Sequence, residues 1–478
     1  MPTILGANTL STGYDVANSL RLNSGDSPYM HKVKDNNNEI NTITFSAWVK
    51  RSKLGATQRI VSHMTNGFAD YFYFRFNDSD VFEFAFKGSA NNIVWTTNRI
   101  FRDVSAWYHI VARVDTTNGT AGNRVRIYVN GVQETSFSAS TNPDQNETFS
   151  IGTTSDPIVV GGLYGSGYGI SSGSTSEHFG GYIAELVVCE GQSLAPTSFG
   201  EFDEDSPTQW KPINVSGLTF GNNGFYLDFE DSGNLGNDAN GGTDLTEVNI
   251  AATDQSTDTC TNNFATLNPL DVTLLSNVGN TFTEGNLVVT DGSSNYLVAN
   301  GSIAVTQGKW YFEVKMIEST DTHVASGVMV VDLDLDDKSD GAANGNYGWL
   351  YATNGQKRNA GTSSNYGDTY TQNDIIGVAL DMDNKAIYFS KNGTFQASGD
   401  PTSGASKTNA AYTNLAGTIT AQVYDGQGSE EHEFSMNFGS PNHSVSSGNA
   451  DANGHGNFEY AVPSGYFALC SKNLAEFG

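Results

Sequence analysis

The chain has 478 residues, which is too long for one ordinary domain, so two or three domains are expected. Its formal charge of −28 repels phosphate backbones and anionic headgroups, which excludes binding to nucleic acid or to a membrane surface. The acidity suits either solubility in salt or divalent-cation binding on acidic loops. No stretch approaches the length of a membrane span, the N-terminus lacks the pattern of a secretory signal, and three cysteines make no disulfide framework.

The first 40 residues are polar and irregular, and we expect them to form an arm. Strands begin at residues 42–50, where apolar residues alternate and one face points inward. Residues 71–76 read Tyr-Phe-Tyr-Phe-Arg-Phe, which predicts a central strand covered on both faces. Residues 81–86 alternate cleanly with three phenylalanines inward, and residues 180–188 close the first domain.

One strand-and-turn signature occurs once in each half of the chain. Residues 123–133 and 384–395 each place Asn-Gly between two strand segments, after a strand that ends in Asp. Asn-Gly supplies the positive φ angles of a type I′ turn, so it is a strong hairpin signal. Two all-β modules are therefore expected.

The second half of the chain again shows alternating strand segments, after a polar stretch. Residues 201–262 form a connector without a core of its own, which Trp210, Phe225, Tyr226 and Phe229 attach to a neighbouring module. Inward rows then recur in the segments 310–316, 376–382 and 433–439. Weak helical patterns occur only in residues 11–22 and 469–477. We predict an all-β chain of two jelly-roll-type β-sandwich domains, residues 41–200 and 263–478, joined by the polar connector.

The first domain resembles the laminin-G-like, concanavalin A-like jelly roll. The resemblance rests on residues 45–49, 107–114, 127–131 and 179–186. The second resembles the SPRY domain through residues 308–314, 374–380, 387–393 and 434–439. SPRY domains commonly bind partners through loops at one edge of the sandwich, so this resemblance implies a binding function for the loops.

Three phrases resemble fibre and appendage proteins of tailed bacteriophages, notably marine ones. They are residues 195–202, 261–270 and 466–474. This resemblance implies a virion surface protein that is made in the host cytoplasm and released by lysis. The N-terminal arm would then attach the protein to the particle.

Aromatic side chains on loops are the expected ligand-binding residues, because flat amphipathic rings stack well on sugar faces. One group lies in the glycine-rich stretch 161–169 and the other in the SPRY-like half. The six candidates are Tyr164, Tyr168, Tyr347, Tyr351, Tyr366 and Tyr370. Trp349, set among apolar neighbours, is expected to be buried.

The densest carboxylate cluster is the candidate metal site. Its alternating acidic residues, Asp332, Asp334, Asp336 and Asp340, could converge on Ca²⁺. Asp337 stands where an EF-hand loop requires Gly, so a solvated strand face is the alternative. A disulfide between Cys260 and Cys470 is disfavoured, because the chain folds in a reducing compartment.

No catalytic constellation emerges from the sequence. Residues 201–205, Glu-Phe-Asp-Glu-Asp, are similar to the Glu-x-Asp-x-x-Glu strand of concanavalin-type glycosidases, but Ser206 replaces the final Glu. The eight histidines show no paired zinc spacing, and there is no Gly-x-Ser-x-Gly elbow.

We therefore expect a non-enzymatic virion protein, a tail fibre or capsid appendage, that binds a host glycan or surface protein through its loops. The expected partners are other virion proteins and further copies of the chain in a homotrimer, whose multivalency would offset weak single-site binding. The alternatives are a purely structural head-decoration or tail-assembly subunit and a polysaccharide depolymerase.

Overall fold

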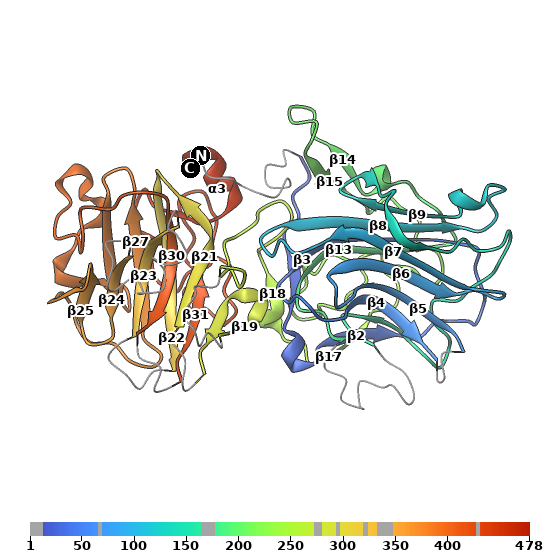
Figure 1. Cartoon of the computed structure of the whole chain (residues 1–478), viewed down its shortest axis with the longest axis horizontal. Coiled ribbons are helices and arrows are strands. Elements are labelled where there is room, and N and C mark those ends of the chain that lie inside the picture. Colours follow the sequence, from blue (N-terminus) through green and yellow to red (C-terminus); the bar gives the residue numbers. More distant parts are fainter. Residues whose placement is uncertain are drawn as a thin grey trace. The chain divides into compact units, whose positions relative to one another are not determined.

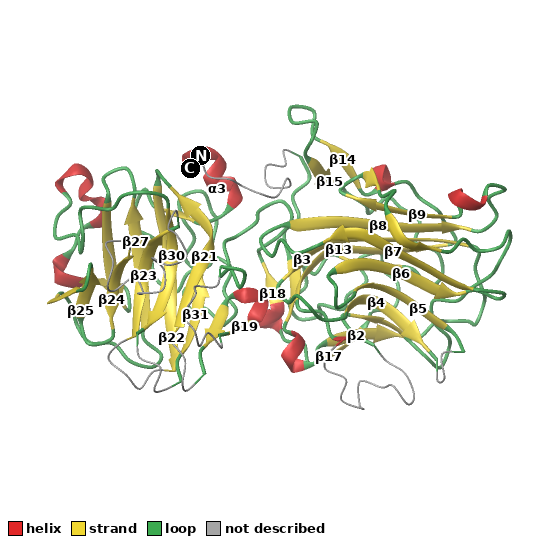
Figure 2. Ribbon diagram, in the orientation of Figure 1, coloured by secondary structure: helices red, strands yellow, loops and turns green. Residues whose placement is uncertain are grey.

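The computed structural model describes residues 13–65, 69–163, 177–271, 280–292, 297–318, 324–331, 348–426 and 431–478. The chain divides into two compact units between Thr261 and Asn262, which we call the first and second units. Strands make up nearly all the regular structure (Figure 2), so the predicted all-β fold class is confirmed. No described helix has the length and hydrophobicity needed to cross a membrane.

Two sheets form the first unit (Figure 1). In the described residues, sheet A has the order β10–β9–β8–β3–β13–β1–β18, with β16 also beside β13. Its strands are β1 (Ser19–Leu22), β3 (Thr42–Arg51), β8 (Trp107–Asp115), β9 (Val125–Val129), β10 (Val132–Gln133), β13 (Gly181–Glu190), β16 (Phe225–Leu227) and β18 (Gln255–Ser256).

Sheet B has the order β11–β7–β6–β5–β4–β12–β2–β17 within the described part of the chain. Its strands are β2 (Tyr29–Lys32), β4 (Gln58–Met64), β5 (Tyr71–Phe76), β6 (Val81–Lys87), β7 (Asn92–Ile100), β11 (Phe137–Ser140), β12 (Ile158–Val160) and β17 (Thr246–Val248). A separate hairpin joins β14 (Gly200–Phe202) to β15 (Trp210–Pro212).

The core of the first unit lies between these sheets. The predicted inward rows of 43–49, 82–86 and 125–129 all belong to it. Phenylalanine dominates, and Phe45 stacks on Phe72 with ring centroids 4.4 Å apart. Alternation along each strand therefore identified the buried face correctly.

The predicted arm and connector are both parts of the first sandwich, which corrects those two boundaries. β1 and β2 lie within residues 1–40, yet β1 pairs with β13 and β2 with β12. β16 and β17 lie within residues 201–262 and add to sheets A and B. β1, β2 and β17 are short and set in polar sequence, so the alternation that reveals a longer strand is missing there. The segment 224–229 does read as a strand, and it contains β16.

The connector packs through the aromatic residues that the sequence indicated. Phe225 and Phe229 enter the core between the sheets, while Tyr226 and Trp210 pack on the outer face of sheet A. The prediction that these four side chains attach the connector to a neighbouring module is confirmed. The predicted end of the connector at residue 262 agrees with the division between the units.

The second unit is also a sandwich. In its described residues, sheet C has the order β19–β20–β31–β22–β27–β28–β29, with β32 beside β22, and sheet D has the order β21–β30–β23–β24–β25–β26. Sheet C contains β19 (Thr281–Thr283), β20 (Val288–Thr290), β22 (Lys309–Glu318), β27 (Ile375–Asp381), β28 (Ala386–Lys391), β29 (Thr394–Phe395), β31 (Glu433–Asn437) and β32 (Phe467–Ala468). Sheet D contains β21 (Leu297–Val305), β23 (Val324–Val330), β24 (Gly348–Ala352), β25 (Gln356–Asn359), β26 (Thr362–Asn365) and β30 (Ile419–Asp425).

Helices are short. Residues 11–22 do not form the weakly indicated helix in their described part, because β1 begins at Ser19. The C-terminal helix α3 (Ser471–Phe477) agrees with the other weak pattern. The remaining described helices are 3₁₀ turns: η1 (Ser24–Asp26), η3 (Ala121–Asn123), η6 (Pro196–Ser198), η7 (Ala252–Asp254), η8 (Glu284–Asn286), η9 (Gln396–Ser398) and η10 (Pro401–Ser406).

Both Asn-Gly signatures form the predicted turns. Asn130 and Gly131 have φ angles of 49° and 76°, and Asn392 and Gly393 have 48° and 78°. Two consecutive positive φ values are those of a type I′ turn. The turns join β9 to β10 and β28 to β29.

Replacing Gly131 by alanine should cost more stability than its φ angle alone explains. A β-carbon at this position would overlap the ring of Trp210. Gly191 has a similar φ of 80° but open space around it, so Gly191→Ala is the matched control. We expect about 1 kcal/mol for the control and a further ~1–3 kcal/mol for Gly131→Ala in urea unfolding. Equal losses would show that the ring moves aside freely.

All three cysteines are buried free thiols in the structure. Burial raises the pKa of both Cys189 and Cys470 to about 12. These groups therefore remain uncharged thiols at neutral pH, which makes them poor nucleophiles.

Candidate functional site

The predicted aromatic sites have different outcomes. Tyr164, Tyr168 and Tyr347 lie outside the described residues. Tyr351 and Tyr370 are 0% and 2% exposed, so their prediction as ligand-binding residues is wrong.

These two tyrosines are core residues. Their rings lie 5.2 Å apart, and the Tyr370 hydroxyl donates to the Tyr351 carbonyl at 2.8 Å. Tyr366 is half-buried and packs edge-on against Tyr351. Trp349 is 2% exposed, as predicted. A buried aromatic-rich segment and an exposed aromatic binding loop can have the same composition. Composition alone therefore could not show that Tyr351 and Tyr370 are core residues.

The four aspartates of the predicted metal site, Asp332, Asp334, Asp336 and Asp340, also lie outside the described residues. Ca²⁺ binding by this cluster stays a prediction.

The acidic run at 201–205 belongs to the β14–β15 hairpin. Asp203 accepts hydrogen bonds from Lys211 Nζ at 3.1 Å and from two backbone N–H groups of its own turn. Lys211 also lies 3.5 Å from the exposed Glu201. These carboxylates stabilise a turn, so the sequence interpretation of this run as a polar segment and not a glycosidase pair agrees with its geometry.

A buried serine–histidine pair lies beneath the same hairpin. Ser46 Oγ is 2.8 Å from His109 Nε2, while Trp210 Nε1 donates to His109 Nδ1 at 2.8 Å. Because Nδ1 accepts, Nε2 carries the proton and donates to Ser46. The imidazole therefore cannot remove the serine proton, and burial lowers the pKa of His109 to about 3. This pair is structural.

The open face of sheet B offers a different kind of site. Along β5, Phe72, Phe74 and Phe76 are fully buried, whereas Tyr71, Tyr73 and Arg75 are only partly buried. The strand is thus covered on one face only, which corrects the prediction of cover on both. We call Tyr71, Tyr73 and Arg75, with Arg59 of β4 and Glu83 of β6, the Tyr73 face.

Two guanidinium groups flank the central ring of the Tyr73 face. Arg75 lies 4.0 Å and Arg59 5.3 Å from the Tyr73 centroid, measured from each guanidinium carbon. Tyr71 stacks alongside at 5.9 Å with an interplanar angle of 15°. Cations near an aromatic face are attracted by its quadrupole, so the rings and the arginines hold one another in place.

Carboxylates fix the two arginines. Arg75 Nη2 lies 2.7 Å from Glu83 Oε2, and Arg59 Nε donates to Glu177 Oε2 at 2.8 Å. The other oxygen of Glu83 accepts from Asn77 Nδ2 at 3.1 Å. Burial raises the pKa of the Tyr73 hydroxyl, which keeps it a neutral group that can donate and accept hydrogen bonds.

This arrangement suits recognition of a polar ligand with an apolar face. The rings offer stacking surface, and Arg75, the Tyr73 hydroxyl and the Glu83 carboxylate offer fixed hydrogen-bond partners, whereas Arg59 is 3% exposed and supports the Tyr73 ring. Sequence reasoning missed the site because tyrosine was counted as apolar in the strand 71–76. Arg75, at an alternate position with Tyr71 and Tyr73, was the available signal that this face is open.

Comparison with known families gives the same two-part division. Residues 24–190 match the concanavalin A-like lectin/glucanases superfamily. Residues 309–425 match the SPRY domain. The chain carries a concanavalin A-like domain followed by a SPRY domain. Laminin-G-like and SPRY domains are typically non-catalytic binding domains, and the Tyr73 face lies in the concanavalin A-like domain.

Similarity to individual proteins is partial. A stretch of 89 residues is 33% identical to the ATP-dependent RNA helicase DDX1 of Xenopus laevis, which covers 19% of this chain and 11% of the helicase. The chain thus spans about a tenth of that relative. Among solved structures, the SPRY domain of human HERC1 has 18% identity and a TM-score of 0.26, covering 31% of this chain and 87% of that chain.

Two further solved structures are similar to part of the chain only. A heptameric SAP-like pentraxin from Limulus polyphemus has 16% identity and a TM-score of 0.28, over 38% of this chain and 80% of that chain. Stonustoxin has 14% identity and a TM-score of 0.28, over 36% and 27% of the two chains.

Proposed function

We propose that this chain is a non-enzymatic binding protein that holds a glycan on the Tyr73 face of its concanavalin A-like domain. The observation that carries the proposal is the partly exposed tyrosine pair of β5, with the partly exposed Arg75 and the buried Arg59 fixed beside it by carboxylates. A pyranose offers an apolar C–H face for the rings and hydroxyls for the charged groups. The binding surface is then the face of a sheet and not the sandwich loops.

The proposal extends to the surface of a bacteriophage particle. The phrases at residues 195–202, 261–270 and 466–474 support a tail fibre or capsid appendage, and a host-surface glycan would be the ligand. Other virion proteins and a homotrimeric assembly complete this proposal. Several copies would raise the avidity of individually weak sites. Synthesis in the host cytoplasm and release by lysis belong to the same proposal.

Replacing Tyr73 by alanine should abolish most of the glycan binding. The change removes the ring that both guanidiniums flank, and a central aromatic anchor of this kind typically carries ~1.4–2.7 kcal/mol, or about 10- to 100-fold in affinity. The measurement is binding of the full chain to a glycan array, followed by titration calorimetry with the best ligand. Tyr460→Ala, at a half-buried tyrosine of the second unit, is the matched control and should bind like the unchanged protein.

Three outcomes would contradict the proposal. Equal binding by both variants would place the ligand elsewhere. Absence of binding to any glycan and to host cells would favour a purely structural subunit. Release of reducing ends from host polysaccharide would favour a depolymerase.

A further inference from the structure

Three metal-ligating side chains meet at one end of the second sandwich. Asp291 directly follows β20, Asp425 is the last residue of β30, and His432 directly precedes β31. Asp291 is 2% exposed, and the other two are 0% exposed. No spacing rule in the sequence indicates this group, because its members lie 134 and 7 residues apart along the chain.

Backbone pairing fixes the positions of these side chains. The N–H of Asp291 donates to the His432 carbonyl at 3.1 Å, and the N–H of His432 donates to Asp291 Oδ1 at 2.5 Å. Asp425 comes from the other sheet, where it pairs with Leu297 and Val324. The cluster therefore joins sheet C to sheet D through groups held by strand ends.

The ligand atoms converge at distances that suit a small metal ion. His432 Nδ1 lies 3.4 Å from Asp291 Oδ2 and 3.6 Å from Asp425 Oδ2. One ligand atom from each residue lies within 4.8 Å of the others. Zinc bonds of about 2.0–2.2 Å in a tetrahedron place neighbouring ligand atoms roughly 3.3–3.6 Å apart, whereas an octahedron with bonds of about 2.0–2.1 Å places them roughly 2.8–3.0 Å apart.

We propose that Asp291, Asp425 and His432 bind one Zn²⁺ ion in the second unit. Two carboxylates balance the charge of a divalent ion when the imidazole is neutral, and imidazole is a ligand that suits zinc better than calcium or magnesium. Among the described residues these three supply ligands, and a tetrahedral zinc site has four positions in total. The ion would connect sheet C to sheet D at this end of the second unit.

The competing explanation is an ion pair in which a protonated His432 bridges the two aspartates. Both explanations use the same contacts, but they differ in metal content. A zinc site needs Nδ1 free of its proton, whereas the ion pair needs that proton in place.

The test is zinc binding by the full chain. After treatment with EDTA and dialysis, the protein is titrated with ZnCl₂ by calorimetry, and the bound zinc is measured by mass spectrometry. We expect one Zn²⁺ per chain. Asp425→Asn and His432→Gln should each lower the zinc affinity by at least about 100-fold, because losing even a hydrogen-bond partner of a ligand costs 10- to 100-fold.

Asp368→Asn, at an exposed aspartate of the same unit, is the matched control and should leave zinc binding unchanged. Binding of Co²⁺ to the unchanged protein, with the visible absorption of a tetrahedral site, supports the proposal even where a variant fails to fold. Absence of stoichiometric zinc, equal zinc binding by all variants, or binding of Ca²⁺ in place of Zn²⁺ would each overturn it.

Discussion

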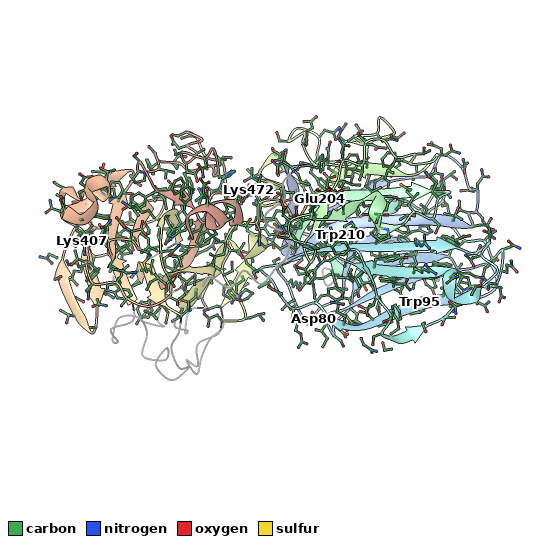
Figure 3. All side chains as sticks on the ribbon, turned by 90° about the horizontal axis from the view of Figure 1, so that it is seen from above. Asp80, Trp95, Glu204, Trp210, Lys407 and Lys472 are labelled. Carbon is green, nitrogen blue, oxygen red and sulfur yellow. The ribbon has the colours of Figure 1, made fainter. Side chains whose placement is uncertain are left out.

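Trp210→Ala should lower the free energy of unfolding of the first unit by about 3–5 kcal/mol, the usual cost of truncating a buried tryptophan. Trp210, the first residue of β15, is 1% exposed and packs on the outer face of sheet A (labelled in Figure 3). Its Nε1–H also satisfies His109 Nδ1, so truncation leaves a buried acceptor without its donor. Urea unfolding followed by tryptophan fluorescence and circular dichroism measures the loss.

Two variants separate the causes of this effect. Trp210→Phe keeps most of the ring but loses the N–H group, and it should cost about 1–3 kcal/mol. Glu204→Ala, at an exposed position of the same hairpin, should stay within about 0.5 kcal/mol of the unchanged protein. A loss below 1 kcal/mol for Trp210→Ala would show that the hairpin does not contribute to the stability of the unit.

The stability of the first unit should fall as the pH rises from about 5 to 9, because Glu185 is buried and, within the described part of the chain, its carboxylate accepts hydrogen bonds from tyrosine hydroxyls. Glu185 is 4% exposed, and its carboxylate accepts from the Tyr226 hydroxyl at 2.9 Å and from the Tyr14 hydroxyl at 3.4 Å. Burial, helped by the nearby Asp228, raises the pKa of Glu185 to about 8.

The sign of the pH effect follows from proton binding. Between about pH 4.5 and 8 the folded chain keeps the Glu185 proton that the unfolded chain has lost, so rising pH favours unfolding. The stabilisation that the protonated Glu185 gives to the folded state is fully present below pH 4.5 and is lost as the pH passes 8. Each pKa unit corresponds to 1.36 kcal/mol, so the change is on the order of 3–5 kcal/mol.

Glu185→Gln is the variant that tests this prediction, since glutamine has the same shape without the charge. It should remove this pH dependence and stabilise the first unit at pH 8–9, with little effect at pH 5. Urea unfolding at pH 5, 7 and 9 makes the comparison. Parallel pH profiles for the two proteins would show that another group is responsible.

The sequence was informative wherever a strand alternates or a turn has a single solution. β8 ends at Asp115, as the signature predicts, and both Asn-Gly pairs form type I′ turns, because few other residues tolerate two consecutive positive φ angles. Short strands such as β17 and β18 were missed, since three residues or fewer cannot show a period of two. The burial of Glu185 could not be predicted for a related reason. Glu185 has a φ of 48° at a bulge in β13, and the bulge breaks the alternation of buried and exposed side chains along the strand.

The candidate sites were harder to predict because both arise from pairing between strands. Arg59 and Arg75 flank Tyr73 only after β4 and β5 align, and a register shift lies between Arg59 and Val61. His432 and Asp291 likewise become neighbours only through the pairing of β31 with β20. Local patterns carry no information on such register. Tyr351 shows the opposite error. The aromatic residues around it suggested an exposed binding surface, but the fold buries its side chain in the core.

The first unit joins the two ends of its own sequence: β1 pairs with β18, which begins 236 residues after Ser19. The edge of sheet A therefore cannot be completed until the ribosome has synthesised almost the whole unit. Such distant contacts predict slow folding, during which the uncovered edge of β13 is available for mispairing with other chains. A fragment cut at residues 24 and 190 would lack β1, β16 and β18 and would keep that edge permanently open.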